Sequence, residues 1–243
     1  MIARKQSTVP GTKSGTGKGL HHWGTGAAFA ALSGLASLAG CSDGNSNVLG
    51  GVASIAYISQ DAIEPGNVFD YTNGGHHGNI FTLTPPTASG VKKNITNWAD
   101  ASINSFDVSF DAREIVLSAR APGDDHFHVY RVNVDGSNPC DAAKGIVSVG
   151  ACQITEGAND EVYSVYLPGG RIYYMTNKNV EGPEVPQFRD EYERATTAQA
   201  AHMNLDGSDQ VLGPRNVSHR VSPTLLSDGR IMTTEWRHLG YTN

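Results

Sequence analysis

The sequence predicts an all-β protein built from repeated units, for three reasons. A strand-like stretch, a tight turn and a second strand that begins with isoleucine occur three times, and Ile115, Ile172 and Ile231 lie 57 and 59 positions apart. Glycine is frequent, with 28 residues in 243, which suits chains rich in tight turns. A unit of this size cannot bury its own apolar face, so a near-constant period indicates an array of similar β-units.

Apolar alternation places the individual strands. Residues 52–59 and 80–83 are expected to form strands, and the prolines at 85 and 86 end the second because proline cannot donate to a β-ladder. Residues 115–118 read as a buried strand. In the next predicted strand, alternation puts Tyr130, Val132 and Val134 on one face.

Two shorter elements recur between these strands. Asn133–Ser137 and Asn204–Ser208 carry Asp-Gly, which predicts hairpins with a type I′ turn. Short Ile-Thr-like segments, expected to be strands, follow at Ile95-Thr96, Ile154-Thr155 and Val217-Ser218. Each unit of about 57 residues then holds four antiparallel strands, the content of a propeller blade.

The sequences of these segments resemble a known repeat. Val132–Ser137, Gln153–Thr155 and Leu226–Ile231 are similar to TolB-type propeller repeats. Phe188–Tyr192 followed by Met203–Ser208 resembles the propeller region of hydrazine synthase alpha-subunit-like proteins. The resemblance covers about residues 52–243 and implies a TolB-like β-propeller, which in that family is followed by haem domains.

The predicted propeller is incomplete. About three to four blades fit into residues 52–243, whereas propellers close with 4 to 8. The turn at Phe110–Arg113 also lacks the glycine of its counterparts, which predicts a type I variant there. We therefore expect either a fragment of a longer protein or a half that depends on a partner.

The N-terminus predicts a secretory signal. Residues 1–22 are basic and polar, residues 23–40 form a short apolar helix-like run, and Leu38-Ala39-Gly40-Cys41 ends it. This ending resembles the lipobox of bacterial lipoproteins, which implies cleavage after a signal peptide of residues 1–40 and lipidation of Cys41. Residues 41–51 then form a flexible tether, and Ser42 favours the outer membrane by analogy. The alternative is a cleaved signal or an uncleaved anchor with an incidental cysteine.

Cys140 and Cys152 lie 12 positions apart in one loop. Outside the cytoplasm they are expected to form a disulfide that pins a long insertion, and the alternative is two reduced thiols. A metal site would need more ligands close by. The chain contains no Cys-x-x-Cys-His, so no c-type haem is expected within it.

The remaining polar clusters have structural explanations beside the functional ones. His126 and His128, next to Asp124 and Asp125, could bind a transition metal on one strand face but suit a polar hairpin better. The others are His76-His77, Asp160-Glu161 and Asp190-Glu191 in predicted loops, and the triad residue types His219, Ser222 and Asp228 without a nucleophile elbow. We assign no catalytic, cofactor or metal residue.

The charge of the chain limits the kinds of partner that it is expected to bind. The chain holds 18 basic and 24 acidic residues, and four of the basic residues lie in the first 40 positions, where there is no acid. The acidic body argues against a nucleic-acid partner, since phosphate binding needs clustered Lys and Arg. The sequence predicts an envelope lipoprotein on the periplasmic side, anchored in the membrane through Cys41, whose propeller loops bind a protein or small ligand. The alternative is the N-terminal propeller of a multi-domain haem redox protein related to the hydrazine synthase alpha subunit.

Overall fold

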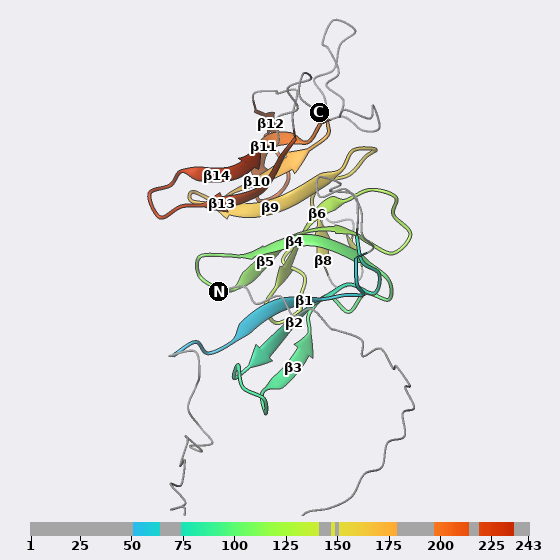
Figure 1. Cartoon of the computed structure of the whole chain (residues 1–243), viewed down its shortest axis with the longest axis vertical. Coiled ribbons are helices and arrows are strands. Elements are labelled where there is room, and N and C mark those ends of the chain that lie inside the picture. Colours follow the sequence, from blue (N-terminus) through green and yellow to red (C-terminus); the bar gives the residue numbers. More distant parts are fainter. Residues whose placement is uncertain are drawn as a thin grey trace, which may run out of the picture.

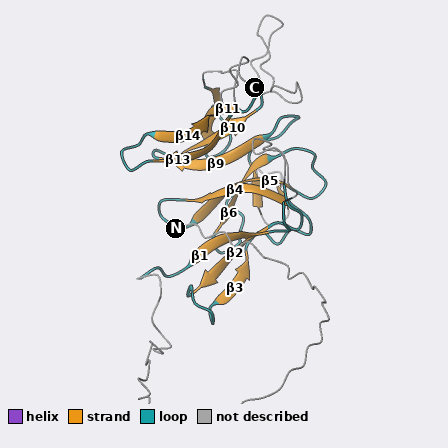
Figure 2. Ribbon diagram, in the orientation of Figure 1, coloured by secondary structure: helices purple, strands orange, loops and turns teal. Residues whose placement is uncertain are grey.

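The described part of the chain is a stack of four antiparallel sheets (Figure 1). The computed structural model describes residues 51–63, 74–140, 147–148, 151–178, 197–213 and 219–235, and these residues form strands and loops but no helix (Figure 2). Accordingly, no described segment is a helix of the length and apolar character needed to span a membrane. The predicted signal helix lies outside the described residues.

Each sheet is assembled from strands that are close together in the sequence. Sheet 1 contains β1 (Ile55–Ser59), β2 (Asn79–Thr84) and β3 (Val91–Asn94). Sheet 2 has the order β4 (Ser102–Val108), β5 (Glu114–Arg120), β6 (His128–Asn133), β8 (Ala151–Gln153) and β7 (Val147–Ser148). Sheet 3 has the order β9 (Glu161–Leu167), β10 (Arg171–Thr176), β11 (Gln199–Asn204) and β12 (Val211–Leu212). Sheet 4 contains β13 (Arg220–Leu225) and β14 (Ile231–Glu235).

The repeat predicted from the three isoleucines is confirmed. Ile115, Ile172 and Ile231 begin or nearly begin the second strand of their sheets and lie opposite Val108, Tyr166 and Leu225. The prediction of four strands in every unit is only partly right, because the four sheets contain three, five, four and two described strands and do not close into a ring.

The sheets bury their apolar faces against one another. Ile115, Leu117 and Tyr130 of sheet 2 are fully buried and pack with Ile80 and Trp98 from sheet 1 and its connection. The opposite face of sheet 2 offers Val116 and Val129, which pack against Ile172, Tyr174 and Met203 of sheet 3. Tyr130, Val132 and Val134 face the first of these cores together, as their alternation predicted. Sheet 2 is thus buried on both faces.

The Asp-Gly turns dock onto the preceding sheet. A Cβ on Gly136 would lie 3.3 Å from the Ile95 carbonyl oxygen, and a Cβ on Gly207 would collide with the Ile154 carbonyl oxygen. Ile95-Thr96 and Ile154-Thr155, predicted as strands, in fact follow β3 and β8 and form these docking sites. The third such segment, Val217-Ser218, lies outside the described residues. Arg131 strengthens the contact between the Gly207 turn and sheet 2, since it pairs with Glu114 and donates from Nη1 to the Leu205 carbonyl at 2.8 Å.

The type I′ prediction for these turns is wrong. Only the glycine has positive φ, 81° at Gly136 and 80° at Gly207. In each turn the glycine N–H donates back to the asparagine carbonyl, Asn133 or Asn204. Two ordinary turn residues followed by one left-handed glycine make a three-residue hairpin loop. At the turn without glycine, Ala112 takes the left-handed conformation instead, with φ 56°.

Side chains of sheet 2 satisfy the free edge of β9. The Tyr163 N–H donates to Asn104 Oδ1 at 3.1 Å and the Tyr166 N–H to Asp107 Oδ2 at 2.9 Å. Ser118 Oγ accepts from the Ser164 N–H at 3.1 Å. Burial raises the pKa of Asp107, although its two backbone hydrogen bonds act in the opposite direction. Two neighbouring sheets are therefore joined by hydrogen bonds without sharing a strand.

A matched pair of glycine substitutions tests the docking contact. Gly207→Ala and Gly229→Ala both place a Cβ at positive φ, but the Cβ at position 229 has no atom within 4 Å. The free energy of unfolding should fall by about 1 kcal/mol in both variants, because alanine is strained in the left-handed conformation. Gly207→Ala should lose at least about 2 kcal/mol more, because the two sheets must separate to fit it. Urea unfolding measures the difference, and equal losses would rule out tight docking.

Candidate functional site

Histidine and carboxylate side chains meet at one end of the stack, which we call the loop edge. It comprises residues 60–63, 74–78, 97–101, 121–127 and 155–160, with 177–178, 197–198 and 219. The opposite end, the turn edge, carries the short hairpin turns. β4, β9 and β13, which are the first strands of sheets 2, 3 and 4, all start at the loop edge, so the residues that precede them lie there.

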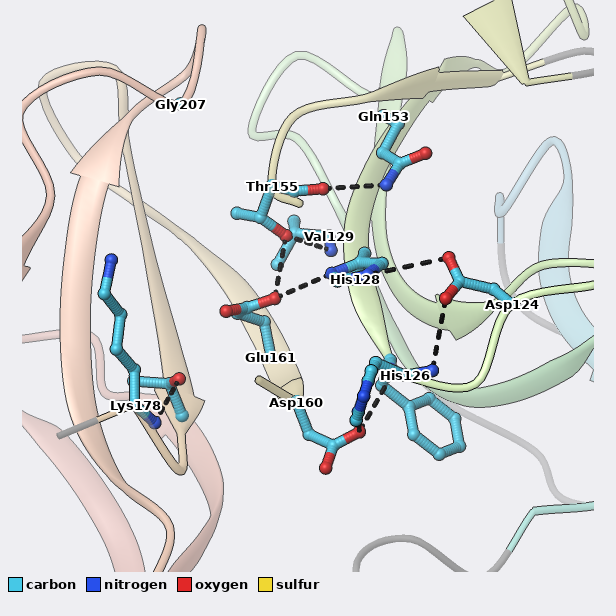
Figure 3. Close-up of polar contacts among 12 residues, drawn as sticks. Asp124, His126, His128, Val129, Gln153, Thr155, Asp160, Glu161, Lys178 and Gly207 are labelled. Atoms are coloured by element: carbon cyan, nitrogen blue, oxygen red, sulfur yellow. Dashed lines mark hydrogen bonds and ion pairs between the residues drawn. The ribbon is translucent and has the colours of Figure 1, made fainter. Parts of the chain in front are cut away.

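His128, the first residue of β6, adjoins the loop edge and lies between the carboxylates of Glu161 and Asp124 (Figure 3). Its side chain is 3 % exposed, with Nδ1 2.9 Å from Glu161 Oε2 and Nε2 3.5 Å from Asp124 Oδ2. Thr155 completes the arrangement, since its Oγ1 donates to Glu161 Oε2 at 3.1 Å and accepts the Val129 N–H at 2.9 Å. The start of β6, the start of β9 and the end of β8 are thereby tied together.

Asp160 forms the second half of this cluster. Its Oδ1 accepts the Phe127 N–H at 3.0 Å and lies 3.5 Å from His126 Nδ1. Asn177 donates from Nδ2 to Asp160 Oδ2 at 3.0 Å and accepts the Asp160 N–H at 2.8 Å. The imidazole ring of His126 therefore contacts Asp160, and that of His128 contacts Glu161 and Asp124, so the two rings do not converge on one point (Figure 3). The Asp124 carboxylate also accepts the His126 backbone N–H at 3.2 Å.

The protonation of the cluster follows from its burial and its charges. Burial lowers the pKa of His128, but the hydrogen bond and charge of Glu161, with Asp124 and Asp160 nearby, raise the net pKa above the ordinary 6.5. Burial raises the pKa of Glu161, against the hydrogen bonds from His128 and Thr155. Both raised values mean that the folded chain binds more protons than the unfolded chain. The stability that the pair contributes therefore falls as pH rises.

Related hydrogen bonds occur at the corresponding places in the other sheets. In sheet 1, Asn79 stands where His128 stands in sheet 2, and its Oδ1 accepts the Thr96 hydroxyl at 2.9 Å while the Ile80 N–H donates to that hydroxyl at 3.1 Å, so the connection that leads to sheet 2 is held against β2. Between sheets 3 and 4, the Ala198 N–H donates to His219 Nδ1 at 3.0 Å, as the Phe127 N–H does to Asp160. The ionisable cluster is thus one version of a repeated joint.

A second cluster at the loop edge is exposed. His77 Nδ1 lies 2.8 Å from Asp61 Oδ2, and His76 Nδ1 lies 3.3 Å from Asp100 Oδ1, with all four side chains more than half exposed. The Asp61 N–H donates to the His76 carbonyl and the His77 N–H to Asp100 Oδ1, which fixes these three loop segments together. Hydrogen bonding and the charge of Asp61 raise the pKa of His77.

The other residues singled out in the sequence do not meet. His219 is buried at the loop edge, whereas Asp228 lies in a turn at the opposite end of β13 and binds Arg230. Ser222 is exposed within β13, so these triad residue types are not brought together. Asp160 and Glu161 are buried, 7 % and 5 % exposed, and do not line an open surface. Within the described residues, no three His, Cys, Asp or Glu side chains are grouped to hold a metal ion.

The remaining predicted residues are two acids and three cysteines. Asp190-Glu191 and Cys41 fall outside the described residues. Cys140 and Cys152 are paired as a disulfide in the structure, with Cα atoms 5.6 Å apart, within the range that disulfides span. The bond ties the chain after the Asp-Gly turn to β8, which joins two segments of sheet 2.

Sequence comparison leaves the chain without a matching family model or a matching curated protein. The structure itself defines the class, an all-β protein made of four stacked antiparallel sheets. Among solved structures, this fold is similar to hydrazine synthase of Kuenenia stuttgartiensis, with a TM-score of 0.53 over 76% of this chain at 12% identity. The match spans 28% of that chain, so the similarity concerns the fold of one part of a longer protein.

The protonation of the buried joint yields a pH prediction. The free energy of unfolding should fall as pH rises above 6.5, because folded His128 holds its proton to higher pH than unfolded His128. Below pH 6.5 the free energy of unfolding of His128→Gln should be about 2 kcal/mol lower than that of the wild-type protein, because a charged hydrogen bond is replaced by a neutral one. Above pH 6.5 its free energy of unfolding should change less with pH. Asp124→Asn, which keeps the His128–Glu161 pair, is the control and should flatten the profile only in part. Identical pH profiles for the wild-type protein and His128→Gln would contradict this account.

The disulfide is tested separately. Peptide mapping without reduction should recover Cys140 and Cys152 on one linked fragment, and Cys140→Ser should lower the free energy of unfolding by about 3 kcal/mol, as loop closure of this size predicts. Alkylation of both thiols without a reductant would show that they are free.

Proposed function

We propose that this chain is a lipid-anchored binding or scaffold module of a bacterial envelope, with its sheets arranged as part of a TolB-like β-propeller. The strand order of sheet 3, the repeated joints and the fold similarity support the propeller. The lipobox-like Leu38-Ala39-Gly40-Cys41 supports the anchor, because a thiol is the nucleophile that accepts a diacylglycerol. Ser42 at the second position supports the outer membrane.

The observation that carries the binding role is the exposed cluster of Asp61, His76, His77 and Asp100. These side chains are hydrogen-bonded to one another in pairs and fixed to the ends of buried strands, so they present charge in a set geometry. Loops held on a rigid scaffold are where binding residues concentrate. By contrast, the buried His128–Glu161 pair is fully engaged in holding two sheets together.

The test compares the two ends of the stack. Full-length tagged protein is crosslinked in its host, and the recovered envelope proteins are identified for the wild type and for a loop-edge variant with Asp61→Asn, His76→Asn, His77→Asn and Asp100→Asn. We expect the loop-edge variant to lose its partner by about tenfold, as truncating interface hot spots does. A turn-edge variant with Asp111→Asn and Asp228→Asn is the matched control. Equal recovery from all three proteins would reject the binding role of the loop edge.

The similarity to hydrazine synthase favours a second candidate. In this case the chain is the N-terminal propeller of a multi-domain haem redox protein, and the haem domains belong to the rest of the polypeptide. The full-length gene product separates the two candidates. Covalent haem on that product, seen as haem absorbance after denaturation, supports the redox protein, and its absence supports the binding module.

The anchor predicts a simple phenotype. Cys41→Ser should abolish incorporation of labelled fatty acid and release the protein from the membrane fraction, because the acyl chains supply the membrane affinity. Cys140→Ser should leave both properties unchanged. Fatty-acid labelling of the Cys41→Ser variant would show that the lipid is attached elsewhere. Absence of labelling from the wild-type protein would show that the chain has no lipid anchor.

A further inference from the structure

Three of the four sheets begin with an inner strand that pairs with the isoleucine strand. These inner strands, β4, β9 and β13, share a pattern in which a buried β-branched residue, Ile103, Val162 or Val221, is followed directly by a bulge. The three residues are each 59 positions apart. The inner strand is therefore as regular a part of the repeat as the isoleucine strand.

Sheet 1 has the isoleucine strand but no described inner strand. Ile55 lies opposite Leu83 in sheet 1 as Ile115 lies opposite Val132 in sheet 2, so β1 is the counterpart of β5. In the described residues, β1 pairs only with β2, and its other edge has no strand beside it. The residues just before it, 42–50, consist mainly of Gly, Asn, Ser and Asp, which are poor strand formers.

The free edge of β1 also lacks the protection seen on other edges. Its sequence, Ile55–Ser59, has neither a charge nor a proline, and all five residues are partly buried. The outer edge of the same sheet, β3, carries Lys92 and Lys93, while β7 and β12 are two residues long. The inner edges β4, β9 and β13 are interrupted by bulges. Natural edge strands use lysine, shortness and bulges to prevent pairing, so an unprotected edge is a pairing site.

The face of sheet 1 beside this edge is aromatic and half-covered. Tyr57 and Phe81 stack at 5.8 Å between ring centroids, and Lys92 Nζ lies 3.9 Å from the Phe81 centroid. Leu117 and Tyr130 hold the same places in sheet 2 and are fully buried. An added strand on β1 would extend the sheet across this side and place its own alternate side chains beside Tyr57.

We propose that β1 is a strand-addition site, which takes up an extended segment of a partner polypeptide as the inner strand of sheet 1. The segment pairs antiparallel with Ile55–Ser59, as β4 pairs with β5. Its chemistry follows from the three inner strands present: a β-branched residue, one or two residues that form a bulge, and then alternating apolar residues. Main-chain hydrogen bonds provide the affinity and the apolar positions the specificity. This inference does not depend on the proposed binding role of the loop edge.

Hydrogen exchange of the full-length chain tests the proposal. The probe is a synthetic peptide with the sequence of residues 159–169, which contains the β9 pattern, and the control is the same peptide with proline in place of Ser164 and Tyr166. The first peptide should slow exchange by about tenfold at those amides of residues 55–59 that point away from β2, since they gain a hydrogen-bond partner, and should leave β3 unchanged. The proline peptide should have no effect.

Three results would overturn it. Amides of β1 as protected without peptide as those of β5 would mean that the chain already fills the edge. Protection of β1 that grows with protein concentration, together with a dimer in analytical ultracentrifugation, would mean that two copies pair through it. An unchanged exchange rate at saturating peptide would mean that the edge does not accept a strand. Tyr57→Lys, which adds charge beside the edge, should weaken peptide binding if the proposal is right.

Discussion

The stack depends on one constraint, which is that neighbouring sheets bury their faces against each other without sharing a strand. Regular strand pairing therefore stops at each sheet edge, where only single backbone hydrogen bonds cross, such as the Glu161 N–H to the Phe127 carbonyl and the Arg220 N–H to the Ala198 carbonyl. Other groups must add to them to hold the sheets together. At the loop edge this is done by side chains such as Thr155 and Thr96, and along β9 by Asn104, Ser118 and Asp107. At the turn edge it is done by a glycine close to a carbonyl. Buried N–H groups left without these partners would each cost about 1 to 3 kcal/mol.

The buried ionisable cluster is best understood from this constraint. Catalytic residues often have perturbed pKa values, but structural ion-pair networks perturb pKa values too. His128 has both ring nitrogens near carboxylates and stands in the position that Asn79 and Gln199 occupy in the neighbouring sheets. A position that can be filled by amide side chains in other repeats has a structural task in each of them. Between sheets 2 and 3 the same task is performed by charged groups, His128, Glu161 and Asp124.

The parts of the fold that are predictable from sequence are those with a local cause. Alternation placed Tyr130, Val132 and Val134 on one face, and the period placed Ile115, Ile172 and Ile231 in equivalent strands. Glycine in the Asp-Gly turns predicted hairpins, although not their turn type, because the residue before the glycine adopts an ordinary conformation and the sequence does not encode this. Asp160 and Glu161 were expected in an open loop, since acids are rarely buried. Their burial depends on Phe127, Thr155 and His128, which come from other strands, so no local pattern could reveal it.

The same reasoning accounts for a fold that survives at 12% identity. In sheet 2 an acid on the second strand, Glu114, pairs with a base on the third, Arg131. In sheet 3 the base is on the second strand, where Arg171 Nη2 lies 2.6 Å from His202 Nδ1 on the third and Nη1 reaches Asp209. The position before the isoleucine thus carries an acid in sheet 2 and a base in sheet 3, and in each sheet it contacts a polar partner on the third strand. What the fold requires is complementarity between positions, not particular residues, so repeats and relatives can diverge in sequence while every sheet still docks on the next.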